Sequence, residues 1–231
     1  MKIKQVTLAL STAIALNFSS IALASPPVEP ATSLNSTKAQ TVHDHLLQIQ
    51  QAWAVTHYRT KEKHKEAKFE SLIDDIDELA NSFPKAAEPK IWQGIIRATY
   101  AGTAGGLSAL SLVKDARDYL EQAIKIDDKA LNGSAYTSLA SLYLKVPGWP
   151  IGFGDDDKAE ELFEKAMKIN PDGLDSNYFY AEYLMEEDDY DDAYAALTKA
   201  LQAPLRTSRP IADEERRKEL NQLLEQLSDK I

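Results

Sequence analysis

The chain has 231 residues, no cysteine and a formal net charge of −10 at pH 7. This length is enough for one domain with its own core. The lack of cysteine excludes disulfide bonds, thiol catalysis and the lipid-bearing cysteine of a lipoprotein. The acidic balance argues against a nucleic-acid partner, because proteins of that class offer a basic surface to the phosphates.

Residues 1–24 have the composition of a secretory signal peptide. Two early lysines precede an apolar run over residues 6–16, and Ala22-Leu23-Ala24 supplies a small-x-small cleavage signal. Asn17 and two serines interrupt the apolar run, which leaves it short of the ~20 residues that a membrane span requires. We therefore expect cleavage before Ser25, no membrane span in the mature chain, and a soluble protein in the periplasm of a Gram-negative source.

The next stretch, residues 25–37, is rich in proline, serine, threonine and alanine, with few large apolar side chains. This composition predicts a flexible lead-in without fixed structure. Helical periodicity begins near Lys38, with Val42, Leu46 and Trp53 on one face. The folded domain is therefore expected to cover residues 38–231.

The clearest pattern is the amphipathic segment 159–171, which predicts the second helix of a helical hairpin. Ala159 and Ala166 are small, Phe163 is large, and Pro171 cannot continue the helix. Small residues let a partner helix approach closely, and the large residue fills the gap one turn along.

The same alternation of small and large residues occurs twice more. Ala193 begins one copy 34 residues after Ala159, and Ala116 begins another upstream. A spacing of 34 residues is the period of the tetratricopeptide repeat (TPR). No strand pattern is present, so we predict an all-α fold: a TPR-like α-solenoid of three to four helix-turn-helix units with a C-terminal capping helix. The expected helices run from Lys38 onward, over 63–82, from Glu88 to the glycines of 102–106, and over 107–126, 133–144, 157–170, 174–186, 191–202 and 211–227.

Residues 146–155 interrupt one repeat between its two helices. Two prolines and three glycines exclude a helix here, and the segment adds about seven residues to the standard unit. Its aromatic residues, Trp149 and Phe153, would be costly to leave in water. Two interpretations stay open: the loop is a recognition or oligomer contact, or both rings fold back and complete the packing of the stack.

Residues 116–227 resemble the TatT family, the periplasmic T component associated with TRAP (tripartite ATP-independent periplasmic) transporters, and related stand-alone bacterial TPR proteins. Three segments carry the resemblance: YLKVPGWPIGFGD at 143–155, NPDG at 170–173 and NYFY at 177–180. The resemblance implies a non-enzymatic helper that forms a homo-oligomer, a trimer in this family, and docks a periplasmic substrate-binding protein. The alternative is a stand-alone adaptor in envelope assembly or quality control.

Partner recognition is expected on the inner surface formed by the first helices of the units, where large amphipathic side chains are good contact residues. The candidates are Trp92, Tyr136, Tyr178 and Tyr180 in the helices and Trp149 and Phe153 in the loop. Trp92 and Tyr136 occupy signature positions of the repeat, where packing between helices is the competing interpretation. Tyr178 lies off that face and is the preferred candidate.

No grouping of side chains indicates catalysis, a cofactor or a metal. His43 and His45 point in different directions on a helix, and His57 and His64 are expected to be separated by a turn near Thr60. The acidic residues 186–192 lack the glycine and the final glutamate of an EF-hand loop, and they fit the polar turn between two helices. We therefore predict a binding protein without cofactor or metal, with an enzyme as the less favoured alternative.

Overall fold

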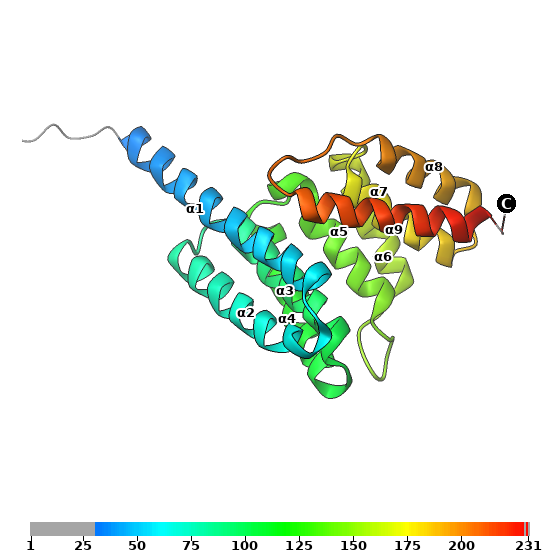
Figure 1. Cartoon of the computed structure of the whole chain (residues 1–231), viewed down its shortest axis with the longest axis horizontal. Coiled ribbons are helices and arrows are strands. Elements are labelled where there is room, and N and C mark those ends of the chain that lie inside the picture. The colour runs from blue at the N-terminus through cyan, green and yellow to red at the C-terminus, as the bar shows by residue number, and fades with distance from the viewer. Residues whose placement is uncertain (1–30, 229, 231) are drawn as a thin grey trace, which may run out of the picture.

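The computed structural model describes residues 31–228 and residue 230, with side chains from residue 41 onward. Within this range the chain is all-α, and helices adjacent in sequence pack together in a stack (Figure 1). The helices are α1 (Ala31–Ala54), α2 (Lys65–Ser82), α3 (Ala87–Ala104), α4 (Gly106–Ile126), α5 (Ala130–Lys145), α6 (Asp156–Ile169), α7 (Leu174–Glu186), α8 (Tyr190–Gln202) and α9 (Pro210–Ser228). The predicted fold class is confirmed. The predicted signal peptide lies outside the described residues.

The first helix starts earlier than the sequence predicts. α1 begins at Ala31, so the expectation that residues up to 37 lack fixed structure is wrong for 31–37. Neither proline nor glycine occurs in α1, and its packed apolar face, with Leu46 and Trp53 buried, supplies a nucleus. Each further residue toward the N-terminus then adds a hydrogen bond without a new nucleation cost.

A short irregular connection separates α1 from α2. The end of α1 continues as one turn of π-helix, η1 (Val55–Arg59), and the chain then bends at Thr60 before a 3₁₀ turn, η2 (Glu62–His64). The predicted turn near Thr60 is therefore confirmed. The π-turn places His57 and Tyr58 beside Trp53, a position that matters for the site below.

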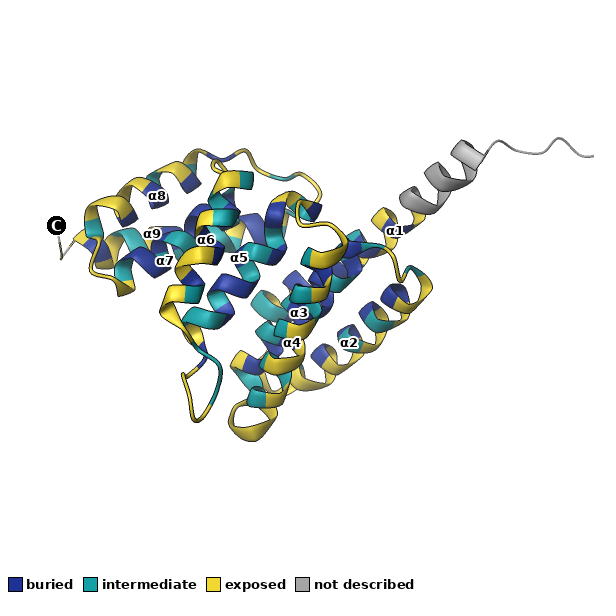
Figure 2. Ribbon diagram, turned by 180° about the vertical axis from the view of Figure 1, so that it is seen from behind, coloured by how far each residue is buried: buried dark blue, intermediate teal, exposed yellow. Residues whose placement is uncertain are grey.

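The pair α5–α6 has the packing that its sequence predicts. Ala159, Phe163 and Ala166 are at most 1% exposed. α6 begins where expected, because the Asp155 carboxylate accepts a hydrogen bond from the backbone N–H of Lys158 at 3.0 Å. Figure 2 shows buried residues gathered on the faces where neighbouring helices meet.

The register of α3 differs from the prediction. The small residue against α4 is Gly94, where an added Cβ would lie 2.6 Å from Leu120 Cγ. Trp92 is buried between helices, as the packing interpretation of its signature position predicts, and lies edge-to-face on Trp53 of α1 with centroids 5.4 Å apart. The repeat pattern places its small residue at position 96, which is Ile96 in this chain. Because Gly94 allows the close approach to α4, Ile96 does not have to be small.

The last helix does more than cap the stack. Leu220 and Leu227 of α9 are fully buried in the C-terminal core, as a capping helix requires. The beginning of α9 also reaches η1, where Arg59 forms ion pairs with Glu214 at 3.1 Å and Glu215 at 2.6 Å. In Figure 1, α9 (red) crosses from the right-hand end of the molecule back toward α1 and α3. α9 thus joins the two ends of the stack.

Candidate functional site

A large groove with a volume of about 1410 Å³ lies among the helices. The first helices of the units, α3, α5 and α7, form much of its lining. The end of α1, η1, the beginning of α4 and segments between residues 203 and 219 complete the walls. Residues of the first helices therefore line a depression, and partner recognition there stays a prediction.

One part of the groove is apolar and open to solvent. Ile95 of α3 lines it together with Leu110 and Val113 of α4. At its rim, Leu107 is 88% exposed and Ile151 is 66% exposed, both unusual values for large apolar side chains. The beginning of α4 and the loop that contains Ile151 project from the same end of the molecule in both views (Figures 1 and 2).

The wall contributed by α5 is lined by hydroxyl groups. Ser134, Thr137, Ser138 and Ser141 all face the groove, at the three- and four-residue spacing of one helical face. Thr137 is buried and the three serines are half-buried. The Ser134 hydroxyl already donates to the Leu131 carbonyl at 2.7 Å and can only accept from a ligand. The hydroxyls of Thr137, Ser138 and Ser141 can donate and accept, so this wall can satisfy both polar groups of an extended backbone.

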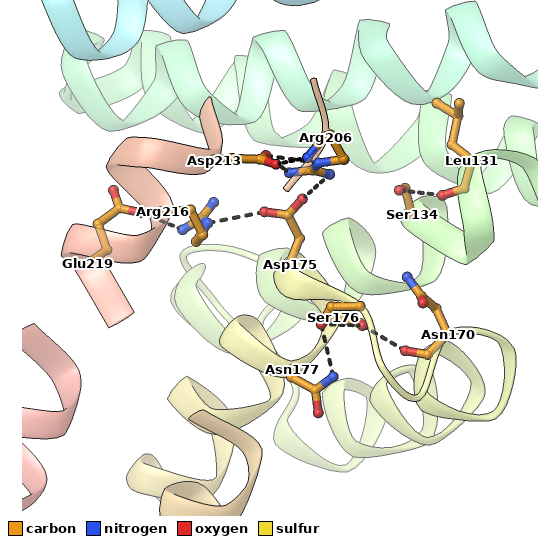
Figure 3. A network of polar contacts seen from close by, with 11 residues as sticks. Leu131, Ser134, Asn170, Asp175, Ser176, Asn177, Arg206, Asp213, Arg216 and Glu219 are labelled. Carbon is orange, nitrogen blue, oxygen red and sulfur yellow. Dashed lines mark hydrogen bonds and ion pairs between the residues drawn. The ribbon is translucent and has the colours of Figure 1, made fainter. Parts of the chain in front are cut away.

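A network of ion pairs closes the other part of the groove (Figure 3). Asp175, in the first turn of α7, accepts from Arg206 at 2.8 Å and from Arg216 Nε at 3.1 Å. Arg206 also binds Asp213 through its side chain and its backbone N–H, and Arg216 donates to Glu219 at 2.7 Å. The network links α7, the segment before α9, and α9 itself.

The electrostatics of this network favour its charged form. Although burial opposes ionisation, Arg206 and Arg216 hold the pKa of Asp175 well below its usual range. Burial also opposes the charge of Arg216, yet Asp175 and Glu219 raise its pKa above the usual value. Arg206 and Arg216 therefore stay paired with the carboxylates around them.

Two tryptophans form the floor beside the network. Trp53 and Trp92 meet edge-to-face, and the Trp53 indole donates to Thr99 Oγ1 at 3.1 Å. The His57 ring stacks on Trp53 with centroids 5.4 Å apart, and the Arg209 guanidinium lies over Trp92 at 5.1 Å. All of these residues line the groove.

Of the candidates in the first helices, Tyr178 and Trp92 line the groove, and both are buried. Tyr178 lies under Arg216, whose guanidinium is 4.1 Å from the ring centroid. Tyr136 and Tyr180 are half-buried and lie outside the groove lining. Tyr136 contacts Asp128 and Lys165, while Tyr180 packs against Phe163.

The two aromatic residues of the loop 146–155 have different environments. Phe153 is half-buried, edge-to-face on Tyr143 at 5.3 Å and under the guanidinium of Arg117 at 4.8 Å. Trp149 is 90% exposed. Backbone bonds from Asp155 to Tyr143 and from Gly154 to Pro147, at 3.0 and 3.1 Å, fix the base of the loop. The loop thus presents Trp149 from a defined backbone.

The comparison with known families addresses the C-terminal part of this structure. Residues 151–206 match the family model of the tetratricopeptide repeat. The matched stretch covers α6, α7 and α8, and together with the helical stack it supports a tetratricopeptide-repeat protein, a class that serves as scaffolds for protein–protein interaction. No curated protein matches the chain.

Two features concern membranes and metals. None of the helices in residues 31–228 combines the length and the apolar character needed to cross a membrane. Among the described residues, no three histidine or acidic side chains are grouped in a way that could hold a metal ion. The all-α repeat fold is typical of scaffolds rather than of enzymes.

Proposed function

We propose that the protein is a secreted, periplasmic scaffold that holds an extended segment of a partner protein in its groove. The observation that carries this proposal is that one groove is lined both by the hydroxyl row of α5 and by apolar side chains of α3 and α4. An extended peptide presents unpaired backbone N–H and C=O groups, which the hydroxyls can bind, and apolar side chains, which the wall near Leu110 and Val113 can receive.

Trp149 supplies a second contact in this proposal. An exposed tryptophan on a fixed backbone loses little side-chain freedom on binding, and tryptophan is enriched among the residues that dominate interface energy. Phe153 anchors the loop from inside. The partner segment would therefore leave the groove past Ile151 and meet Trp149 outside it.

The resemblance to the TatT family indicates a periplasmic substrate-binding protein of a TRAP-type system as the partner. Affinity capture from a periplasmic extract tests this choice. Recovery of a substrate-binding protein supports it, whereas recovery of envelope-assembly proteins supports the adaptor alternative.

The groove itself is tested by a substitution that fills it. Ser138→Trp places a large ring on the hydroxyl wall and should abolish capture of the partner. Ala195→Trp, on an exposed position of α8 away from the groove, is the matched control and should capture as well as the unmodified protein. Equal capture by both variants, each with parental helicity, would remove the groove from the function.

A further inference from the structure

Among the described residues that line the groove, three buried polar atoms have no hydrogen-bond partner: Glu182 Oε2, whose other carboxylate oxygen pairs with Lys145, and Arg209 Nε and His57 Nδ1. The last two flank the tryptophan pair, because His57 stacks on Trp53 and Arg209 lies over Trp92. A buried polar atom without a hydrogen-bond partner destabilises the folded chain, and more so when the group is charged. Such groups at the wall of a groove are the ones that a ligand can satisfy.

Arg209 differs from the two arginines beside it. Arg206 and Arg216 take up the carboxylates of Asp175, Asp213 and Glu219. Arg209 forms no ion pair with any residue that the structure describes. Burial lowers the pKa of Arg209, and Arg206 and Arg216 add to this effect, while Asp175 and Asp213 oppose it. The side chain remains a cation at neutral pH, but one whose charge lacks a direct counter-ion.

We propose that Arg209 forms a carboxylate subsite for the segment that the groove holds. The Nε–H of Arg209 donates to one carboxylate oxygen, and His57, across the tryptophan pair, offers a ring N–H to a polar group of the same segment. The proposal rests on the groove as the binding site of a peptide segment, and it names the chemistry of one residue of that segment.

The surroundings favour a carboxylate over a more highly charged anion. One cation without a counter-ion matches one negative charge. A phosphate would bring nearly two charges close to Asp175, Asp213 and Glu219, which repel it. The hydroxyl row on α5 further favours a peptide over a fatty acid, because an alkyl chain has nothing to offer those hydroxyls.

The direct test observes the Arg209 Nε–H resonance by NMR in the full chain, with assignment from its loss in Arg209→Gln. Three acetylated peptides serve as probes: Ala-Leu-Ala with a free C-terminus, the same peptide amidated, and amidated Ala-Leu-Glu. We expect the resonance to shift in a saturable way with a carboxylate peptide and to stay in place with the neutral one. A response to the first peptide assigns a C-terminal carboxylate, and a response to the third assigns an acidic side chain.

Binding of the responding peptide by variants completes the test. Arg209→Gln should weaken it at least tenfold and His57→Phe should weaken it measurably, whereas Arg117→Gln, which removes an arginine outside the groove, should leave it within twofold. A resonance that ignores both carboxylates, or responds equally to the neutral peptide, overturns the subsite even if a partner protein still binds the groove. If the resonance responds but no partner is captured, the subsite stands and the scaffold function fails.

Discussion

At the scale of single residues, the site depends on how three carboxylates are divided among three arginines: Arg206 and Arg216 pair with all of them, and Arg209 with none. Asp175 is shared by Arg206 and Arg216, two residues that lie on different sides of the start of α9. The two ion pairs fix the beginning of α7 against α9 and the segment before it. Arg209, which takes no part in these pairs, lines the groove. The network therefore holds the structure together, and Arg209 outside it is the available cation.

His57 gives this part of the groove a characteristic pH dependence. Burial, with Lys65 and Arg216 nearby, lowers the pKa of His57 to about 4, while Glu62 opposes the shift. Between pH 6.5 and pH 4 the unfolded chain therefore binds more protons at this residue than the folded chain. The free energy of unfolding must fall as the pH falls through that window, by up to about 3 kcal/mol.

The measurement compares urea unfolding at pH 7 and pH 5 for the parent, His57→Gln and His64→Gln. His57→Gln should lose less stability on acidification than the parent does. His64 is exposed, so His64→Gln should behave like the parent. Identical pH slopes in all three proteins would mean that His57 titrates normally in the folded state.

At the scale of elements, helices and small-residue contacts follow from local sequence, while the register of α3 does not. The pattern at Ala159 and Ala166 involves one helix and its sequence neighbour, so periodicity alone predicts it. In α3, the sequence pattern does not show which face of the helix packs against α4. That orientation depends on the contact of Trp92 with Trp53, 39 residues before it, and of Gly94 with Leu120, 26 residues after it. A local pattern cannot supply such distant contacts.

The candidate site was predictable in outline only. An inner surface on the first helices follows from the repeat, and the hydroxyl row at 134, 137, 138 and 141 was visible in the sequence as polar residues on one face of an otherwise apolar helix. The ion-pair network joins Asp175 to residues 31 and 41 positions away. Such pairing depends on where α9 returns, and no spacing in the sequence encodes that.

Ala166 tests the α5–α6 contact. Ala166→Leu should overpack this contact and lower the free energy of unfolding by about 1 to 3 kcal/mol, because Ala166 is 1% exposed. Ala195→Leu on the exposed surface of α8 should change it by less than about 0.5 kcal/mol. Chemical denaturation measures both values, and equal stabilities would contradict the packing of α6 against α5.

Substitutions in the loop 146–155 test whether each of its two aromatic side chains packs against the fold or is available to a partner. Trp149→Ala should keep the parental free energy of unfolding to within about 0.5 kcal/mol, because the exposed Trp149 side chain buries little surface on folding. Phe153→Ala should cost more than about 1 kcal/mol, because it removes contacts with Tyr143 and Arg117. Thermal and chemical unfolding measure this difference. A Trp149→Ala variant that loses about 3 kcal/mol would show that the ring packs in solution.

At the scale of the whole molecule, α9 converts a stack of helix pairs into a partly closed shape. It is packed into the C-terminal core through Leu220 and Leu227 and paired to η1 through Glu214 and Glu215. Segments from early and from late in the sequence therefore both form walls of the groove. A partner segment bound there contacts helices that are far apart in sequence, so its binding should stabilise the whole domain.

The central claim is that the groove, rather than the outer surface, holds a protein segment. Site-specific photo-crosslinking in the cells that produce the protein tests it most directly, with a benzoylphenylalanine at Ser138 in the groove and, separately, at the exposed Ala195 of α8. The account predicts a discrete protein adduct from position 138 and none from position 195. Adducts of the same size from both positions, or from position 195 alone, would contradict it.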